Sequence, residues 1–278
     1  MSSIDSGGLG GLVHRLARRF ARLAVQVVVP VALVLAWWAT SRDSSSYLYP
    51  PLTDVLESLR DEWLGERVAS DVMPSLGRFA AGYLIAGVVG VAAGTAIGLL
   101  PSLRRGVLPL TEFVRSIPSP LLFPFALVVF GIGDDSKVAL IALGSVWPVL
   151  LNTADGVRGI DPEIHDVARS FRISWPRRIS RVVLPAASPK IVAGLRIALS
   201  VALLLMVVSE MRGGTNGVGF QVRYAERTFD TTGAYAGVIL IGGIGLALNL
   251  LFVAAESRIM RWHRGARGVI ETAGKGAA

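Results

Sequence analysis

The stretch FAAGYLIAGVVGVAAGTAIGLLPSL, residues 79–103, contains 25 residues without one Asp, Glu, Lys or Arg. A helix of about 20 such residues crosses the hydrocarbon core of a membrane, which is about 30 Å thick. Charge-free stretches of similar length lie on both sides of it, at residues 23–41, 116–133, 138–154 and 231–255, and a sixth at 191–209 is interrupted only by Arg196. Together they predict an all-α, polytopic membrane protein with six transmembrane helices.

The composition argues against a soluble enzyme. Of the 278 residues, 52% are hydrophobic and only 17% are charged, whereas a globular chain averages about 25% charged residues. The absence of cysteine excludes a disulfide framework, a thiolate metal site and a cysteine nucleophile. The three histidines, His14, His165 and His263, are far apart and lie outside every charge-free stretch. We therefore expect no catalytic residues and no metal site in this chain.

The distribution of positive charge predicts the orientation in the lipid bilayer. Residues 1–22, 101–107, 158–190 and 256–278 hold 18 Lys and Arg, whereas residues 41–78, 133–137 and 212–233 hold 8. Because Lys and Arg concentrate in cytoplasmic loops, both termini are expected in the cytoplasm of a multi-pass plasma or inner membrane protein. The net charge of +8 is thereby explained without a nucleic-acid partner.

The first loop carries a second helical pattern. Apolar residues recur at helical spacing at Leu52, Val55, Leu56, Leu59 and Trp63, which predicts an amphipathic helix on the outer membrane surface, with a solvated loop as the alternative. The chain thus divides into residues 1–72, with the cytoplasmic N-terminus, first span and external segment, residues 73–257, which form the main transmembrane domain, and a basic cytoplasmic tail at 258–278.

Within the spans, small residues and prolines mark close packing and breaks. Gly90, Gly94 and Gly98 form two overlapping small-xxx-small steps, which allow another helix to approach closely. Pro118, Pro120 and Pro124 interrupt the third stretch, and a helix broken at membrane depth either lines a pathway or is simply kinked. Candidate residues of a pathway or gate are Pro120, Pro124, Trp147, Asn152 and Glu210.

Other charges near the spans have simpler explanations. Glu112 and Arg115 stand three residues apart on one helical face and are expected to pair at the cytoplasmic interface. Arg196 is expected to extend its side chain to the cytoplasmic headgroups. Glu210 follows the fifth stretch beside a glycine-rich loop, where it could act as a gate or as a contact for an external protein.

A membrane span does not explain the loop at residues 158–190. Asp161 is placed as an N-cap and Pro162 as the first helical residue. Ile164, Val167, Ala168 and Phe171 then fall on one face of a short helix. Ser174 is expected to cap a second basic helix, WPRRISRVV, that stops before Pro185. Such a hairpin suits docking in another protein's groove, with attachment to the inner membrane surface as the alternative.

The run DVARSFRISWPRRISRVVLP, residues 166–185, resembles the EAA loop of ATP-binding-cassette importer permeases. In that family a Glu-Ala-Ala triplet precedes a turn glycine and an Ile-x-Leu-Pro end, and here Asp166 to Ala168 and Val182 to Pro185 occupy those positions. Arg172 replaces the turn glycine, which counts against the usual left-handed turn. The stretches RSIPSPLLFPFALVVFGIG, VWPVLLNTADGV and GLRIALSVALLLMVVSEM are similar to the nitrate, sulfonate and taurine branch, and the likeness runs from about Met73 to Glu256.

The resemblance implies a type I importer permease that works as a homodimer, or as a closely related heterodimer, with a cytoplasmic ATPase and an extracytoplasmic solute-binding protein. It assigns contact with the ATPase to one set of loop residues: Glu163, Ile164, Asp166, Val167, Ala168, Phe171, Arg172, Leu184 and Pro185. The chain contains no G-x-x-x-x-G-K-[ST] motif, so ATP and Mg²⁺ are expected on the ATPase and no cofactor on this chain.

The solute implied by the resemblance is a small anion such as an aliphatic sulfonate, taurine or nitrate, with a vitamin precursor or another organic solute as the alternative. An ion-coupled secondary transporter would favour an unpaired acid near the middle of the membrane. A membrane enzyme would need paired carboxylates or an activated serine within the spans. Neither pattern is evident in the sequence.

Overall fold

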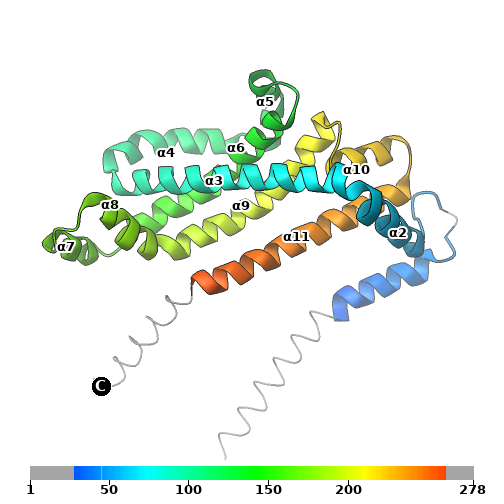
Figure 1. The fold of residues 1–278 in the computed structure, drawn as a ribbon, viewed down its shortest axis with the longest axis horizontal. Helices are drawn as coiled ribbons and strands as arrows, with labels where there is room; N and C mark the ends of the chain where they lie inside the picture. The colour runs from blue at the N-terminus through cyan, green and yellow to red at the C-terminus, as the bar shows by residue number, and fades with distance from the viewer. Residues whose placement is uncertain (1–27, 45, 261–278) are drawn as a thin grey trace, which may run out of the picture.

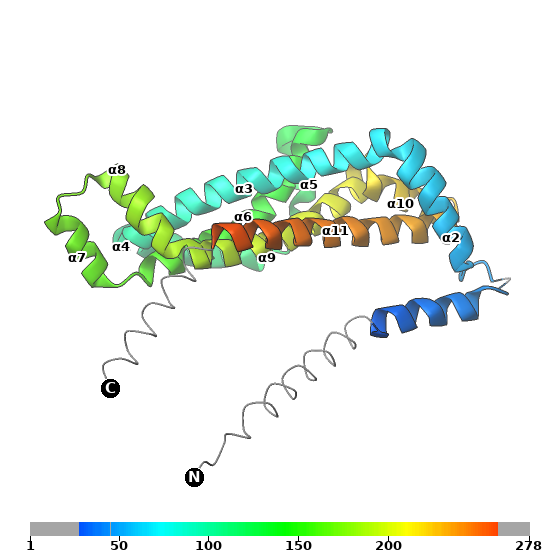
Figure 2. The ribbon, with the colours of Figure 1, turned by 60° about the horizontal axis from the view of Figure 1, so that its bottom comes forward.

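The computed structural model describes residues 28–44 and 46–260, and this part of the chain is built from helices joined by short turns. An apolar helix at Val28–Ser41 comes first. The helices that follow are α2 (Leu52–Ser58), α3 (Met73–Leu99), α4 (Pro101–Ser116), α5 (Phe123–Phe130), α6 (Asp134–Arg158), α7 (Pro162–Ser170), α8 (Trp175–Arg178), α9 (Leu184–Gly213), α10 (Val218–Arg227) and α11 (Thr231–Ile259). Helices α3, α6, α9 and α11 run lengthwise, with α7 and α8 at one end and α2 and α10 at the other (Figures 1 and 2).

Several turns of unusual pitch extend these helices. Wide π-helical turns at Leu59–Glu66 and Val68–Val72 connect α2 to α3, and another at Ile179–Val183 connects α8 to α9. A tight 3₁₀ turn at Ser119–Leu122 precedes α5. As a result, residues 68–99 and 175–213 each form one continuous helical rod.

Close packing of α3 against α6 forms the centre of the molecule. A Cβ atom placed on Gly90 would lie 2.7 Å from Cβ of Val149, and one placed on Gly94 would lie 2.5 Å from the carbonyl oxygen of Leu150. Since real Cβ contacts are essentially never shorter than 3.0 Å, only glycine lets α6 come this near. The predicted small-residue face is confirmed, and its partner is a helix of the same chain.

The segment after the first apolar helix is helical as predicted, but its apolar face is covered by protein. Val55 and Trp63 are fully buried and pack with Val218, Val222 and Leu240 of α10 and α11. Leu56 alone of the predicted apolar face stays clearly exposed. The expected attachment to the outer membrane surface is therefore corrected, because burial against α10 and α11 already removes most of this face from water.

The third predicted span is not one straight helix. Helix α4 ends at Ser116, the next residue Ile117 is extended with ψ of 121°, and the paired helices α4 and α5 meet at a bend of 90°. The cause is local, since the residue before a proline, here Pro118, is driven out of the helical region. The prolines of this stretch therefore produce a sharp turn within it.

Within residues 28–44 and 46–260, four helical rods are long and apolar enough to cross a membrane: Val68–Leu99, Asp134–Arg158, Trp175–Gly213 and Thr231–Arg258. The bent pair of α4 and α5 passes the same test when taken together. The predicted first span begins outside the described residues, and its described part is the apolar helix Val28–Ser41. Both chain termini also lie outside the described residues, so the count of six spans and the cytoplasmic location of both ends stay predictions.

Candidate functional site

The predicted loop hairpin is present at one end of the molecule (Figure 2). Helix α7 covers Pro162–Ser170, and Asp161 caps it as expected, because its Oδ1 accepts a hydrogen bond of 3.0 Å from the backbone N–H of Glu163. Ser174 stands at the N-cap of α8, but its hydroxyl makes no capping bond. The first helix of the hairpin is thus fixed by its own sequence.

The apolar residues of α7 face outward from the molecule. Val167 is 56% exposed and Phe171 is 77% exposed, and Ile164 on the same face is also exposed. Ala168 is the exception, because it is buried. Large apolar side chains on a short, otherwise charged helix are typical of a surface that binds another protein.

The remaining loop residues hold the hairpin in place. The carboxylate of Asp166 pairs with Arg169 one turn later, and Glu163 is exposed beside it. Leu184 and Pro185 are half-buried at the start of α9, and Leu184 packs with Val157, Ile160 and Val183. These two residues therefore anchor the hairpin to the body of the molecule and present little surface to a partner.

Arg172 adopts the left-handed turn although it is not glycine. Its φ is +49°, and the turn makes the two hydrogen bonds of a Schellman motif, from Arg172 N–H to the carbonyl of Arg169 at 2.9 Å and from Ile173 N–H to the carbonyl of Ala168 at 3.1 Å. These bonds satisfy carbonyl groups at the end of α7. The expectation drawn from the missing glycine is thus wrong, and the arginine carries the conformational cost.

The second helix of the hairpin does not stop before Pro185. Helix α8 passes through the π-helical turn Ile179–Val183 directly into α9, and Pro185 lies in the first turn of α9. A proline lacks a backbone N–H and crowds the preceding turn. The wider π-helical turn that precedes it accommodates both effects, so the second helix of the hairpin continues without a break into the long apolar helix α9.

His165 connects the two helices of the hairpin. Its Nδ1 lies 3.0 Å from Nη2 of Arg178, and because a guanidinium can only donate, Nδ1 must be the unprotonated acceptor. Partial burial lowers the pKa of His165, the nearby Arg178 and Arg169 lower this pKa further, and Asp166 opposes them. The hairpin therefore favours a neutral histidine.

A cavity of about 570 Å³ lies beside the bend between α4 and α5. Trp147 and Asn152, two of the predicted pathway residues, line it together with Ser119, Glu112 and Arg115. Glu112 and Arg115 pair at 2.7 Å as predicted. The Asn152 amide nitrogen donates to the carbonyl of Pro148 at 2.8 Å, and its side-chain oxygen has no hydrogen-bond partner among the described residues.

The other predicted pathway residues lie elsewhere. Pro120 and Pro124 form the 3₁₀ turn and the first turn of α5, and they do not line this cavity. Arg196 pairs with Glu256 of α11 at 2.9 Å, so its charge is matched within the chain. Only Trp147 and Asn152 of the predicted pathway set are therefore brought together.

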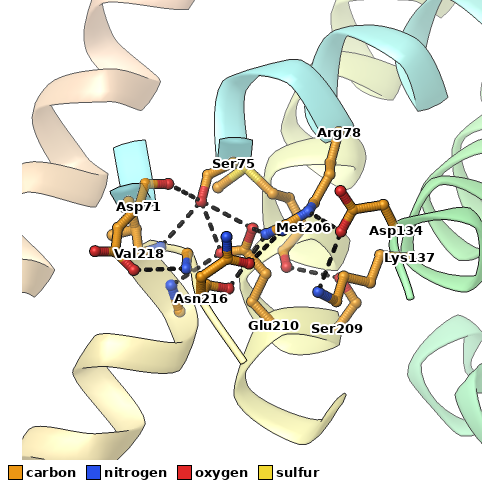
Figure 3. A network of polar contacts seen from close by, with 12 residues as sticks. Asp71, Ser75, Arg78, Asp134, Lys137, Met206, Ser209, Glu210, Asn216 and Val218 are labelled. Carbon is orange, nitrogen blue, oxygen red and sulfur yellow. Dashed lines mark hydrogen bonds and ion pairs between the residues drawn. The ribbon is translucent and has the colours of Figure 1, made fainter. Parts of the chain in front are cut away.

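Glu210 is fully buried in a polar network at the opposite end from the hairpin (Figure 3). Its Oε1 accepts a bond of 2.7 Å from Nη1 of Arg78, and its Oε2 accepts a bond of 3.0 Å from the N–H of Gly219. The hydroxyl of Ser75 lies 2.8 Å from Oε1. Because Glu210 has no exposed surface, it is not placed to contact an external protein in this structure, and its role as a gate stays a prediction.

The network joins several helices at one point. Nε of Arg78 donates to Asp134 of α6 at 2.7 Å, and Asp71 accepts from the N–H of Gly217 at 2.8 Å. Gly217 has a φ of +114°, and a Cβ there would lie 2.5 Å from Cδ of Glu210, so only glycine fits. Arg78 is itself only 3% exposed, and its charge is balanced inside the protein.

Comparisons with known proteins agree with this arrangement. Residues 86–261 match the family described as "Binding-protein-dependent transport system inner membrane component". The chain belongs to this family. It is a permease subunit of an ATP-binding-cassette importer, a multi-pass protein of the inner membrane that works with an ATPase and a binding protein.

Named relatives of the permease cover most of its length. It is 29% identical over 245 residues to a putative aliphatic sulfonates transport permease protein of Bacillus subtilis, covering 87% of this chain and 88% of the relative. It is 32% identical over 242 residues to the taurine transport system permease protein of Escherichia coli, covering 83% and 86%. Other relatives are named as nitrate and bicarbonate permeases.

A solved structure shares the fold of the permease. The inward-facing methionine ABC transporter MetNI aligns with a TM-score of 0.57 at 21% identity, over 69% of this chain and 93% of that one. The type I importer permease fold, predicted from the resemblance of the loop, is thereby confirmed.

The network around Glu210 is the part of the permease that sequence reasoning missed. Arg78 and Asp134 stand at the ends of two predicted spans, and Asp71 lies in the first outer loop. A signal was present, because an arginine and two acids flank spans that end on the same predicted side of the membrane. Their pairing could not be deduced, since Arg78 and Glu210 are 132 residues apart.

Proposed function

We propose that this permease imports a small oxyanion of the sulfonate, taurine, nitrate or bicarbonate type. Support comes from its relatives, which are named for these solutes. Each carries negatively charged oxygen at neutral pH. In this proposal two copies of the chain, or this chain and a close relative, enclose the pathway in the lipid bilayer, and an external binding protein delivers the solute.

The energy would come from a separate ATPase that binds ATP and Mg²⁺, because this chain has no phosphate-binding loop of its own. The observation that carries this part is the outward-facing apolar surface of α7, formed by Ile164, Val167 and Phe171. This surface, together with Glu163 and Asp166 at its border, would seat in a groove of the ATPase. Closure of the two ATPases would then displace α7 and, through the continuous rod of α8 and α9, the membrane span.

The cavity beside Trp147 and Asn152 would be part of the pathway. It carries one cationic side chain, Arg115, and two carboxylates, Glu112 and Asp155. Both carboxylates are paired with arginines one turn away, at 2.7 Å and 3.2 Å. A site without excess positive charge does not retain an anion strongly, as transit requires. Selection among anions would therefore reside in the binding protein.

A matched pair of double variants tests the docking surface. Val167→Asp with Phe171→Asp places two charges on the apolar face of α7, and the ATPase should then no longer co-purify, because burying an unpaired carboxylate opposes association. Tyr47→Asp with Leu64→Asp makes the same change on exposed residues of the other end and should leave co-purification intact. Normal recovery of the ATPase with the first variant would refute the docking role.

Reconstitution tests the solute. The permease, the ATPase and the binding protein are placed in proteoliposomes, and uptake of labelled taurine, an alkanesulfonate, nitrate, bicarbonate and a neutral pyrimidine is measured separately, with and without ATP. The proposal expects ATP-dependent uptake of at least one of the anions. Transport of the neutral compound alone would favour a carrier of vitamin precursors, and uptake without ATP would favour an ion-coupled transporter.

A further inference from the structure

A second polar cavity, of about 580 Å³, lies behind the docking helix. It is bounded by the ends of α3 and α6, by the start of α4, and by α7 and α8. Its charged and titratable lining consists of Arg104, Arg158, Arg169, Arg178, His165 and Asp166. Four guanidinium groups thus face a single carboxylate among the side chains that line it.

Two of these four guanidinium groups, those of Arg104 and Arg178, have no carboxylate partner within the described part of the chain. Asp166 is engaged by Arg169, and Arg158 pairs at 3.2 Å with Asp155 just outside the cavity. Among the described residues, the guanidinium of Arg178 is hydrogen-bonded only to the ring of His165. The guanidinium of Arg104 makes no hydrogen bond or ion pair with any residue in 28–44 or 46–260 and is half-buried.

The two faces of α7 point in opposite directions. Pro162, His165, Asp166 and Arg169 face the cavity, whereas Ile164, Val167 and Phe171 lie on the other side of the helix and are exposed. A ligand in the cavity would consequently leave the docking surface uncovered. It would instead bridge α7 to the ends of two membrane spans.

We propose that this cavity binds a phosphate group, or a closely similar oxyanion, and that the bound group fastens the docking hairpin to the ends of α3 and α6. Arginine is suited to this role because its planar fork of donors matches the oxygens of a phosphate. The volume exceeds that of the anion itself and leaves room for the molecule to which the phosphate is attached.

Two sources of phosphate reach this position. The cavity includes Gly98, Leu99 and Val157, which end the spans α3 and α6, so it lies at the level of the lipid headgroups on the side predicted to be cytoplasmic. An anionic lipid headgroup and a soluble phosphate compound of the cytoplasm present the same chemistry. The inference is independent of the imported solute, since a permease for a neutral compound would contain the same cavity.

Hydrogen exchange of the full-length permease tests the site. The protein is kept in micelles of dodecyl maltoside, whose headgroup contains no phosphate, and exchange in residues 162–178 is followed with sodium phosphate or with sodium chloride at equal ionic strength. A second arm adds phosphatidylglycerol to the micelles and omits sodium phosphate. We expect exchange to slow about fivefold or more in at least one arm, because the bound group would tie α7 to its neighbours.

Two single variants provide the control. Arg104→Gln removes a guanidinium that lines the cavity, and it should weaken the protective effect about tenfold in apparent affinity, as expected for loss of one charge-assisted contact. Arg105→Gln removes the neighbouring charge, which points elsewhere and contacts the carbonyl of Pro101. It should leave protection unchanged.

The outcomes separate the source from the site. Protection by soluble phosphate alone identifies a soluble ligand, and protection by phosphatidylglycerol alone identifies a lipid headgroup. Either result supports the site if the protection depends on Arg104. Equal exchange under all conditions would overturn the proposal. Equal loss of protection in Arg104→Gln and Arg105→Gln would also overturn it, because the effect would then arise from general surface charge.

Discussion

The ion pair between Arg78 and Glu210 is expected to contribute strongly to the stability of the permease. Glu210 is fully buried and Arg78 is 3% exposed, so removing either charge leaves the other in the interior without its partner. Breaking a buried pair in this way typically costs about 3–5 kcal/mol. Glu210→Gln keeps the shape of the side chain and leaves Asp134 beside Arg78, which places its cost near the lower bound, at about 3 kcal/mol.

The surface pair Glu112 and Arg115 provides a matched comparison. Its N···O distance is the same 2.7 Å, but the two side chains are 57% and 54% exposed. Exposed pairs contribute about 0–1 kcal/mol, so Glu112→Gln should have little effect. The contrast between the two variants therefore compares a buried, multiply hydrogen-bonded pair with an exposed single pair of the same charge and N···O distance.

Thermal unfolding in lipid nanodiscs, followed by tryptophan fluorescence, measures both variants. For a chain of this size about 1 kcal/mol corresponds to about 2–4 °C, so Glu210→Gln should lower the midpoint by about 6–12 °C. Replacing both partners with apolar residues, as in Arg78→Met with Glu210→Leu, should recover part of this loss. The reasoning is refuted if Glu210→Gln and Glu112→Gln shift the midpoint equally.

Three further predictions concern the hairpin and the helix packing. Arg172→Gly should remove the cost of a left-handed backbone conformation, about 1 kcal/mol or more, and should therefore slow hydrogen exchange in α7. Arg172→Gln keeps that cost and should leave exchange unchanged. Faster exchange in the glycine variant would contradict this account. Gly94→Ala should lower the unfolding free energy by about 1–3 kcal/mol, because the added Cβ would lie 2.5 Å from a carbonyl oxygen. Gly106 has open space around it, so Gly106→Ala should be neutral or slightly stabilising in the same unfolding experiment. Because the fold holds the pKa of His165 below its ordinary value of 6.5, the contact with Arg178 should be fully present above pH 6.5 and be lost as the pH falls through the lowered pKa. Protection factors in residues 162–178, which compare exchange with the intrinsic rate at each pH, should therefore decrease from pH 7.5 to 5.5, and His165→Gln should abolish that decrease.

Features that depend on local chemistry were predictable from the sequence. The charge-free stretches located the long rods, and Asp161 with Pro162 fixed the start of α7, because a cap and a first-turn proline act within a few residues. Gly90 and Gly94, four residues apart in the sequence, also indicated a closely packed helix face. The partner of that face, α6, could be identified only from the fold.

Features that depend on tertiary context were not predictable. Pro185 does not end its helix, because a π-helical turn before it absorbs the missing N–H, and no local rule specifies that turn. Trp63 is buried against α10 and α11, although its pattern also fits a membrane surface. The pairing of Arg78 with Glu210 depends on which loop ends meet in space.

The 39 residues from Trp175 to Gly213 form a single rod with no hinge of loop residues within it. At 1.5 Å per residue its length is about 58 Å, more than the thickness of a membrane. Arg178, beside the docking hairpin, and Glu210, in the buried network, lie near its two ends. In the proposed coupling mechanism, a displacement of this rod at the docking hairpin would therefore also displace its far end, where Glu210 joins the buried network.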